Sequence, residues 1–253
     1  MANEKQELLK NFAPITLDEM AGIRLMNRID TKYLLTAEEL QRFLHHAAAH
    51  YRVQEVNGER NIAYHTVYLD TDMQQMYRAH ECGHAVREKI RVRTYLTSGI
   101  AFLEVKHKNN KGRTDKKRIP VSSVDTLCED GGDTFLQAHA WYKLEQLSPQ
   151  LENRFRRITL VNKAKTERLT IDSQICFANL LNGNTSRLDN IVVLELKRDG
   201  RTYSPACEML RNMHISRSSF SKYCMGCVLT DEQRKQNRFK TKLRHVLKLN
   251  NQL

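Results

Sequence analysis

Apolar and polar residues alternate through many short segments of this chain. A period of two is typical of β-strands, because successive side chains in a strand point to opposite faces of the sheet. Short turn sequences such as residues 97–99 separate some of these segments, as in antiparallel hairpins. Strands are therefore predicted at residues 27–35, 61–71, 84–96, 100–109, 116–120, 155–164, 168–178 and 190–198.

A few helices accompany these strands. Thr36 followed by Glu39 forms a capping-box pattern, which predicts a helix from there to about His50. Other helices are predicted at 72–82, 134–147 and 204–213, and a basic amphipathic helix is predicted in the tail at 231–250. This order of elements favours an α+β fold that is mainly antiparallel, built on a barrel or a curled sheet.

The domain organisation follows from length and composition. The chain has 253 residues, only four prolines and no low-complexity linker. A chain of this length can form one large domain with its own core. We therefore expect a single domain over residues 1–253.

The polar faces of the predicted strands carry an unusual number of charges. Lys89, Arg91 and Arg93 would share one strand face, opposite Ile90 and Val92. Similar rows recur on other strands: Arg28, Asp30 and Lys32; Glu104, Lys106 and Lys108; Arg168, Thr170 and Asp172; Glu195 and Lys197. Cations also crowd residues 116–118 and 154–157.

Two interpretations compete for these charged faces. Any one of them fits the solvated face of an open antiparallel sheet. The set fits better the interior of a barrel that binds a chain of phosphates, because neighbouring like charges repel one another unless an anion offsets them. The few carboxylates would then hold a divalent metal ion. On this view, removing Arg91 or Arg93 should leave the unliganded fold no less stable.

The overall composition supports an anionic partner. Lys and Arg total 41 against 29 acidic residues, a formal charge of +12. Nucleic acid is not expected, because the sequence shows no RNA-recognition signature, no helix-turn-helix pattern and few aromatic residues among the basic strands. The chain has no apolar run of membrane-spanning length, no secretory signal pattern and six scattered cysteines. We therefore expect a cytoplasmic protein with free thiols.

Several short motifs, taken in order, give the chain a family resemblance. It resembles the polyphosphate polymerase domain of the vacuolar transporter chaperone (VTC) family, a branch of the triphosphate tunnel metalloenzymes. Tyr77 and His80 lie between the second and third of the matching motifs. The motifs between residues 27 and 223 are NRIDTKYLL, YLDT, REKIRVRTY, FLEVKHK, KKR, FRRIT, RLTID, LELK and SFSKY.

The resemblance implies a fold, an activity and a set of site residues. The fold would be an eight-stranded antiparallel β-barrel over about residues 23–228, forming a tunnel with flanking helices. The activity would be transfer of the γ-phosphate of ATP to a growing inorganic polyphosphate chain, with Mn²⁺ or Mg²⁺. The catalytic residues would be Lys32, Arg91, Arg93, Lys106 and Arg157. Further phosphate contacts would come from Arg28, Lys89, Lys108, Lys197, Lys222 and His80, and Glu195 would hold the metal.

One departure bears on the branch of the family. Hydrolase relatives begin with a Glu-x-Glu-x-Lys strand, whereas this chain has Arg28, Asp30 and Lys32 in those places. A cation replaces the first metal-binding carboxylate, which favours a polymerase. A non-catalytic polyphosphate- or nucleotide-binding module and a triphosphate hydrolase remain alternatives, because binding and positioning use the same cations. Eukaryotic relatives carry membrane domains, whereas this sequence has no apolar run of membrane-spanning length. Any coupling to transport would therefore need a separate membrane-protein partner.

Two further motifs are judged coincidental. HECGH at residues 80–84 matches a zinc-binding pattern, but that pattern works only on a helix and Gly83 interrupts it. CMGC at residues 224–227 is a lone Cys-x-x-Cys, whereas a structural zinc site needs four ligands. We expect ordinary histidines and thiols at both places.

Overall fold

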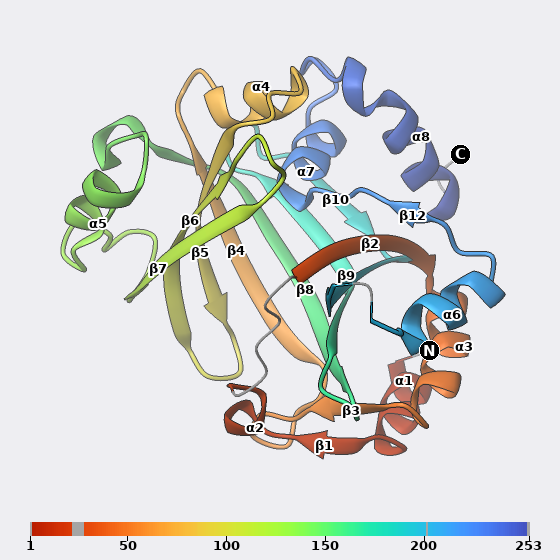
Figure 1. Cartoon of the computed structure of the whole chain (residues 1–253). Coiled ribbons are helices and arrows are strands. Elements are labelled where there is room, and N and C mark those ends of the chain that lie inside the picture. Colours follow the sequence, from red (N-terminus) through yellow and green to blue (C-terminus); the bar gives the residue numbers. More distant parts are fainter. Residues whose placement is uncertain (1, 22–27, 201, 252–253) are drawn as a thin grey trace.

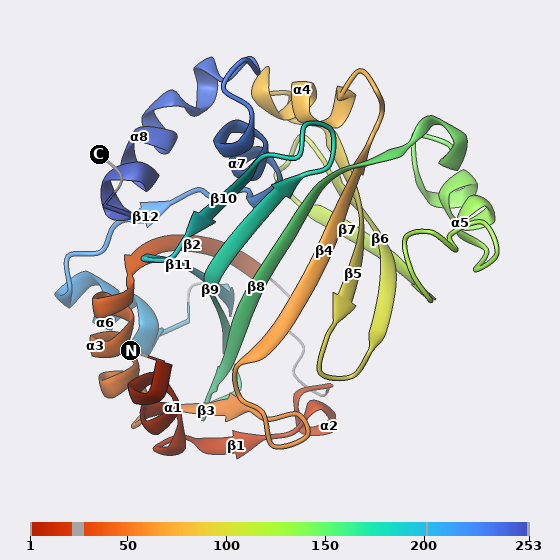
Figure 2. The same cartoon turned by 180° about the vertical axis from the view of Figure 1, so that it is seen from behind.

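A large curled sheet forms the centre of the molecule (Figures 1 and 2). The computed structural model describes residues 2–21, 28–200 and 202–251. Each long strand pairs antiparallel with its neighbour. The long strands follow one another across the sheet in the order β2 (Arg28–Thr36), β11 (Ile191–Asp199), β9 (Glu167–Asn179), β8 (Ser148–Asn162), β4 (Ile62–Asp70), β5 (Arg87–Tyr95), β6 (Ile100–Lys108) and β7 (Thr114–Val121).

These eight long strands confirm the predicted α+β, mainly antiparallel fold, but not the closed barrel. In the described ranges, no backbone ladder joins β7 to β2, so the strands form an open curl. The predicted barrel start at residue 23 lies in the segment 22–27, outside the described residues. Four short strands were not predicted: β1 (Ala13–Ile15), β3 (Tyr51–Gln54), β10 (Thr185–Leu188) and β12 (Arg217–Ser218).

The predicted end of one strand at Pro120 needs a small correction. Strand β7 includes Pro120 and ends at Val121. Proline has no backbone N–H to donate, so it is tolerated where a strand lacks a partner on one side. Among the described strands β7 pairs only with β6, which leaves its other side free for Pro120.

Helices cover the sheet and its ends. The capping box is present: the Glu39 N–H donates to Thr36 Oγ1, and the Thr36 N–H donates to Glu39 Oε2. No helix of the described residues is long and apolar enough to cross a membrane. The helices are α1 (Ala2–Lys10), α2 (Leu17–Ala21), α3 (Ala37–Ala47), α4 (Gln75–Glu81), α5 (Gly132–His139), α6 (Pro205–Asn212), α7 (Lys222–Thr230) and α8 (Lys240–Leu249), with 3₁₀ turns at Leu144–Gln146 and Asn237–Phe239.

Two predicted helices are shorter than expected, for local reasons. The helix predicted at 134–147 ends at His139, because the next residues turn so that the Trp141 N–H can donate to the carboxylate of Glu88. The helix predicted from residue 231 begins only at Lys240. Asp231 instead holds a turn, accepting hydrogen bonds from the Gln233 N–H and from Arg234.

The core is divided among several regions around the sheet. Helices α1, α3 and α6 pack on the outer face of β2, β11, β9 and β8. Helix α5 covers the outer face of β5 and β6. Helix α7 packs instead on the inner face, where Gly226 lies so close to Leu151 and Phe177 that a Cβ would stand 2.5 Å from both side chains. The start of α7 thereby reaches the inner face of the sheet.

Candidate functional site

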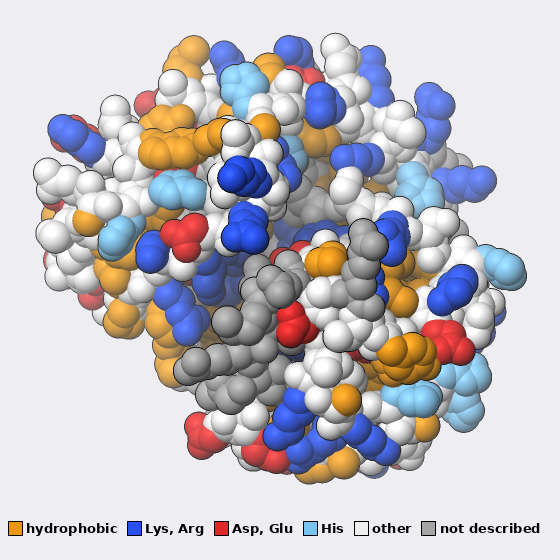
Figure 3. Space-filling view, in the orientation of Figure 1, with side chains coloured by type: hydrophobic (Ala, Val, Ile, Leu, Met, Phe, Trp, Pro, Cys, Tyr) orange, Lys and Arg blue, Asp and Glu red, His pale blue; other side chains and the backbone are white. Residues whose placement is uncertain are grey.

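The inner face of the curled sheet gathers the predicted cations. We call the cationic face the set of side chains that point into the curl, contributed mainly by β2, β5, β6, β8 and β11 and by the start of α7. Figure 3 shows a hollow near the centre of the molecule with Lys and Arg side chains on its walls. The predicted residues that belong to the cationic face are Lys32, Lys89, Arg91, Arg93, Lys106, Arg157, Lys197 and Lys222.

Glu104 is the first of three buried or half-buried carboxylates on this face. The guanidinium of Arg91 donates to Glu104 Oε2 from Nε at 2.8 Å and from Nη2 at 2.5 Å. Lys116 Nζ lies 3.0 Å from the other oxygen. Burial alone would raise the pKa of Glu104, but Arg91 and Arg93 hold it well below its usual range. Glu104 is 0% exposed, so this carboxylate is a buried anion that depends on its cations.

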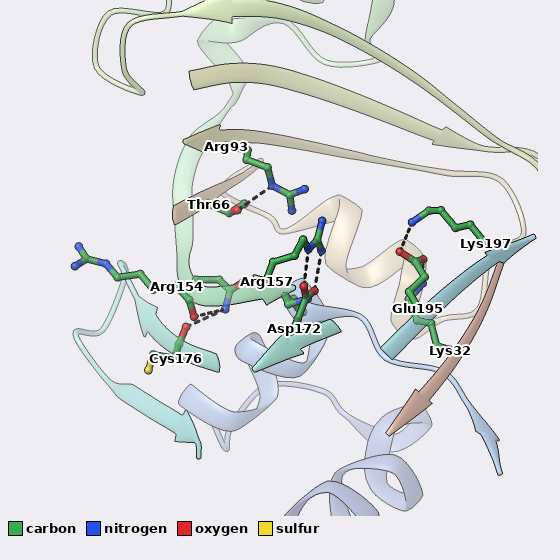
Figure 4. A network of polar contacts seen from close by, with 11 residues as sticks. Lys32, Thr66, Arg93, Arg154, Arg157, Asp172, Cys176, Glu195 and Lys197 are labelled. Atoms are coloured by element: carbon green, nitrogen blue, oxygen red, sulfur yellow. Dashed lines mark hydrogen bonds and ion pairs between the residues drawn. The ribbon is translucent and has the colours of Figure 1, made fainter. Parts of the chain in front are cut away.

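Asp172 is the second carboxylate and is also shared between two cations. Arg157 donates to its two oxygens at 2.6 and 2.8 Å, and Lys222 from α7 forms an ion pair with it. Burial lowers the pKa of Lys222 to about 8, and repulsion from Arg157 contributes. Figure 4 shows Arg157 reaching into the same space as Arg93. Two aromatic rings, Tyr64 and Phe155, lie beneath these cations and stack at 5.2 Å.

Glu195, the predicted metal ligand, is the third carboxylate. Lys197 Nζ lies 2.5 Å from Oε2, and Lys32 forms an ion pair with Oε1 (Figure 4). Burial would raise the pKa of Glu195, but the two lysines hold it well below its usual range. The carboxylate is therefore ionised and able to act as a hard oxygen ligand.

Three cations of the cationic face have no carboxylate partner among the described residues. Lys89 Nζ donates to Ser221 Oγ at 2.8 Å, and Arg93 Nε donates to Thr66 Oγ1 at 3.3 Å. Repulsion from Arg91, followed by burial, lowers the pKa of Lys106 well below its usual range. Burial, together with Arg91 and Arg157, lowers the pKa of Arg93 to about 10. Partly buried positive charge is thus left without an offsetting anion.

The structure distinguishes between neighbouring cations on β5 and on β8. Arg91 is bound to the buried Glu104, so its removal would leave a poorly offset anion. The prediction of unchanged stability is therefore kept only for Arg93. Arg154 and Arg156 do not join Arg157 on the cationic face. Arg154 points away from it in Figure 4, and Arg156 donates to the Asn61 carbonyl. The alternation of the strand explains the separation of Arg157 from both.

Two further predicted phosphate ligands, Lys108 and His80, lie on β6 and α4. Lys108 ends β6 opposite Arg87, the first residue of β5. His80 lies on α4, with Nδ1 3.0 Å from Cys224 Sγ on α7. Burial, then Lys89 and Arg87, lower the pKa of His80 to about 2, so the ring is neutral. Arg28 begins β2, but its side chain lies outside the described part of the structure.

Asp70, from the YLDT motif, positions α4 and α7. Its carboxylate accepts hydrogen bonds from the N–H groups of Met76 and Tyr77 at the start of α4, at 3.0 and 2.9 Å. It also accepts one from the Tyr223 hydroxyl of α7 at 2.6 Å. Asp70 is 0% exposed, and it therefore ties both helices to the end of β4.

Some residues of the site were not among the predicted ligands. Glu104, Asp172 and Lys116 complete the ion-pair network, and Ser221 links α7 to Lys89. The alternating sequence pattern had already placed Glu104 and Asp172 on the same strand faces as cations, but it did not show which cation each one binds. Their assignment as partners needed the register between strands, which places Glu104 opposite Arg91 and Asp172 opposite Arg157.

The carboxylates of the cationic face bear on whether a divalent metal could bind there. No group of three His, Cys, Asp or Glu side chains suited to a metal occurs in the part of the chain that the structure describes. Mg²⁺ is nevertheless often held by one or two carboxylates together with substrate phosphates and water. Glu195 fits this arrangement, because it is ionised and lies among cations that would hold the phosphates.

The HECGH and CMGC motifs lie at the end of α4 and on α7. Helix α4 ends at Glu81, so His80 and His84 do not share a helix face. Cys224 and Cys227 are buried in α7, and all six cysteines are free thiols.

Comparison with known proteins gives one family. The VTC domain matches residues 27–231, whereas no curated protein matches the chain significantly. A solved putative adenylyl cyclase from Hippeastrum, described as having a dominant triphosphatase activity, is 13% identical with a TM-score of 0.48, covering 79% of this chain and 94% of that chain. A putative adenylate cyclase from Vibrio parahaemolyticus is 12% identical with a TM-score of 0.47, covering 78% and 96%. Likenesses at this level carry no argument about activity.

Proposed function

Since this chain belongs to the VTC domain family, we propose that its cationic face is a phosphate-chain tunnel in which the γ-phosphate of ATP is transferred to inorganic polyphosphate. The curled sheet would form the walls of the tunnel. The observation that carries the proposal is the excess of positive charge on the cationic face. Lys89, Arg93 and Lys106 are partly or largely buried cations without carboxylate partners, which a bound polyanion would offset.

The ion-paired cations would contribute as well. Arg157 and Lys222 share Asp172, whose single negative charge leaves the trio with a net positive charge. The same is true of Arg91 and Lys116 around Glu104. The carboxylates hold the long side chains in place, so that they are already ordered when phosphate arrives. Such preorganisation is the main contribution that a protein makes to charge stabilisation in a transition state.

Phosphoryl transfer suits this arrangement chemically. The reaction needs in-line positioning and neutralisation of phosphate oxygens more than covalent help from the protein. The acceptor is a terminal phosphate that is already nucleophilic, so a dedicated general base is not required. Glu195 would hold Mn²⁺ or Mg²⁺, which supplies charge neutralisation at the phosphates. Arg93, Lys106 and Arg157 would position the phosphates themselves.

The localisation and partner predictions remain part of this proposal. ATP and inorganic polyphosphate are the proposed ligands, and nucleic acid is not. A cytoplasmic location and a separate membrane-protein partner stay predictions.

Product analysis tests the proposal. The purified protein is incubated with ATP and Mn²⁺, the polymer is resolved on a gel, and ADP and free phosphate are assayed. Long polyphosphate together with ADP is the expected result. Free phosphate without polymer would assign a triphosphate hydrolase instead. Neither product, with retained binding of polyphosphate, would assign a non-catalytic binding module.

A further inference from the structure

The cationic face changes character at its end beside the β5–β6 hairpin. At this end its side chains are aromatic and apolar: Tyr95 is the last residue of β5, and Ile100 and Phe102 begin β6. Ile100 is 51% exposed, whereas Tyr95 and Phe102 are half-buried. The proposed phosphate chemistry uses none of these three residues. Tyr95 packs partly against the core, but Phe102 and Ile100 lie partly exposed beside the polyanion site, where apolar groups do nothing for phosphate binding.

These residues lie on the same face as the cations and next to them. Side chains two residues apart on a strand share a face, so Tyr95 follows Arg93 and Phe102 precedes Glu104. The strand register pairs Phe102 directly with Arg93. The aromatic end is therefore continuous with the proposed phosphate path. By the rise of ~3.4 Å per residue, Arg93 and Arg91 lie about 7 and 14 Å from Tyr95 along β5.

The rings form a half-buried cluster, with Arg118 over one of them. Tyr95 meets Phe102 edge to face at 6.0 Å, and it contacts Tyr64 at 4.9 Å. The exposed Arg118 of β7 places its guanidinium 4.3 Å from the centre of the Phe102 ring. Arg118 forms no ion pair with the described residues, so it can move away from the ring without breaking one. A flat ring between Phe102 and Arg118 would gain stacking on both faces.

We propose that the surface formed by Tyr95, Phe102 and Arg118 binds the nucleobase of the nucleoside triphosphate, in a stacked position over Phe102. This inference rests on the proposed function and deepens it. The aromatic surface adjoins the cationic face, so a ligand that fits both has a flat aromatic group joined to a chain of phosphates. A nucleoside triphosphate has this structure. The nucleotide then lies in one direction only, with its base at the hairpin and its phosphates passing Arg93 towards Lys89. The acceptor polyphosphate chain approaches from the Lys89 end.

The test compares ATP with inorganic tripolyphosphate, which shares the phosphates but has no base. Affinities are measured by calorimetry in metal-free buffer, where transfer is prevented, for the wild type, Phe102→Ala and Phe102→Tyr. Leu96→Ala is the matched control, because Leu96 is an exposed apolar residue of the same hairpin. Phe102→Ala should weaken ATP binding by about tenfold relative to tripolyphosphate, as expected for the loss of one base–aromatic stack. Phe102→Tyr and Leu96→Ala should keep the wild-type ratio of affinities.

The outcomes separate this inference from the function on which it rests. An unchanged ratio of ATP to tripolyphosphate affinity in Phe102→Ala, with wild-type tripolyphosphate binding, overturns the base site and leaves the phosphate tunnel standing. A wild type that binds neither compound overturns the tunnel and the base site together. Equal weakening of both ligands in Phe102→Ala would show that Phe102 only supports the fold, and it would also overturn the base site.

Discussion

Arg91 and Arg93 are neighbours on one strand face and equally buried, at 8% exposure each, yet their removal should affect stability differently. Arg91→Ala deletes the main partner of Glu104, a carboxylate that is 0% exposed. Breaking a buried ion pair by removing one member typically costs about 3–5 kcal/mol. Lys116 still donates to Glu104 at 3.0 Å, so we expect a loss of about 2–3 kcal/mol.

Arg93→Ala removes a cation that has no carboxylate partner. The variant loses a weak hydrogen bond to Thr66 and contacts with the rings of Tyr64 and Phe155, together worth about 1–2 kcal/mol. It also relieves burial of a charge and repulsion from Arg91, the effects that lower the pKa of Arg93. The opposing effects should nearly cancel, which leaves stability within about 1 kcal/mol of the wild type.

Thermal unfolding of the two variants, in buffer free of phosphate and other polyanions, measures this difference. For a chain of this length, 1 kcal/mol corresponds to about 2–4 °C in Tm. Arg91→Ala should lower Tm by about 4–12 °C, and Arg93→Ala should change it by less than about 4 °C. Adding Glu104→Gln to Arg91→Ala should recover part of the loss, because the stranded charge is gone. Equal losses in both single variants, or no recovery in the double variant, would refute the proposed difference between paired and unpaired cations.

Three other predictions concern the metal, the pH dependence and the helix anchor. Glu195→Gln should reduce metal-dependent phosphoryl transfer at least about a hundredfold, because the metal loses its carboxylate ligand. Metal-free binding of tripolyphosphate should persist or tighten in this variant. Full activity of the variant would exclude Glu195 as a metal ligand. Because burial lowers the pKa of Lys222 to about 8, its charge is present below pH 8 and lost above it. Tripolyphosphate affinity measured by calorimetry should therefore fall between pH 7 and 9, and the fall should be smaller in Lys222→Arg. If the affinity fell equally in the wild type and in Lys222→Arg, the charge of Lys222 would not contribute to phosphate binding. Asp70→Ala should lower Tm by about 4–12 °C, because the α4 amides and the Tyr223 hydroxyl lose their buried acceptor; an unchanged Tm would show that α4 and α7 do not depend on it.

The alternating pattern predicted the long strands and the side chains of the cationic face well. It did so because a period of two is a local property: Lys89, Arg91 and Arg93 fall on one face whatever the strand pairs with. The ion pairs between strands could not be predicted in the same way. The contact between Glu104 and Lys116, for example, depends on the register of β6 and β7.

The irregularity in β9 and the position of helix α7 could not be predicted from the sequence either. Gln174 adopts a positive φ of 52°, and the register between β8 and β9 shifts there. Asp172 and Phe177 can therefore both face inward although strict alternation would separate them. The sequence of helix α7 is mostly apolar and shows no hydrophobic periodicity from which a helix could be predicted. Its position inside the curl is set by tertiary packing around Gly226.

A crystal structure of the protein with inorganic tripolyphosphate would show directly whether the cationic face holds a chain of phosphates. Phosphate groups are expected on the cationic face, within hydrogen-bonding distance of Arg93, Lys106 and Arg157, with Arg91 still bound to Glu104. Tripolyphosphate bound only on the outer surface, or a cationic face that stays free of phosphate at saturating ligand, would contradict it.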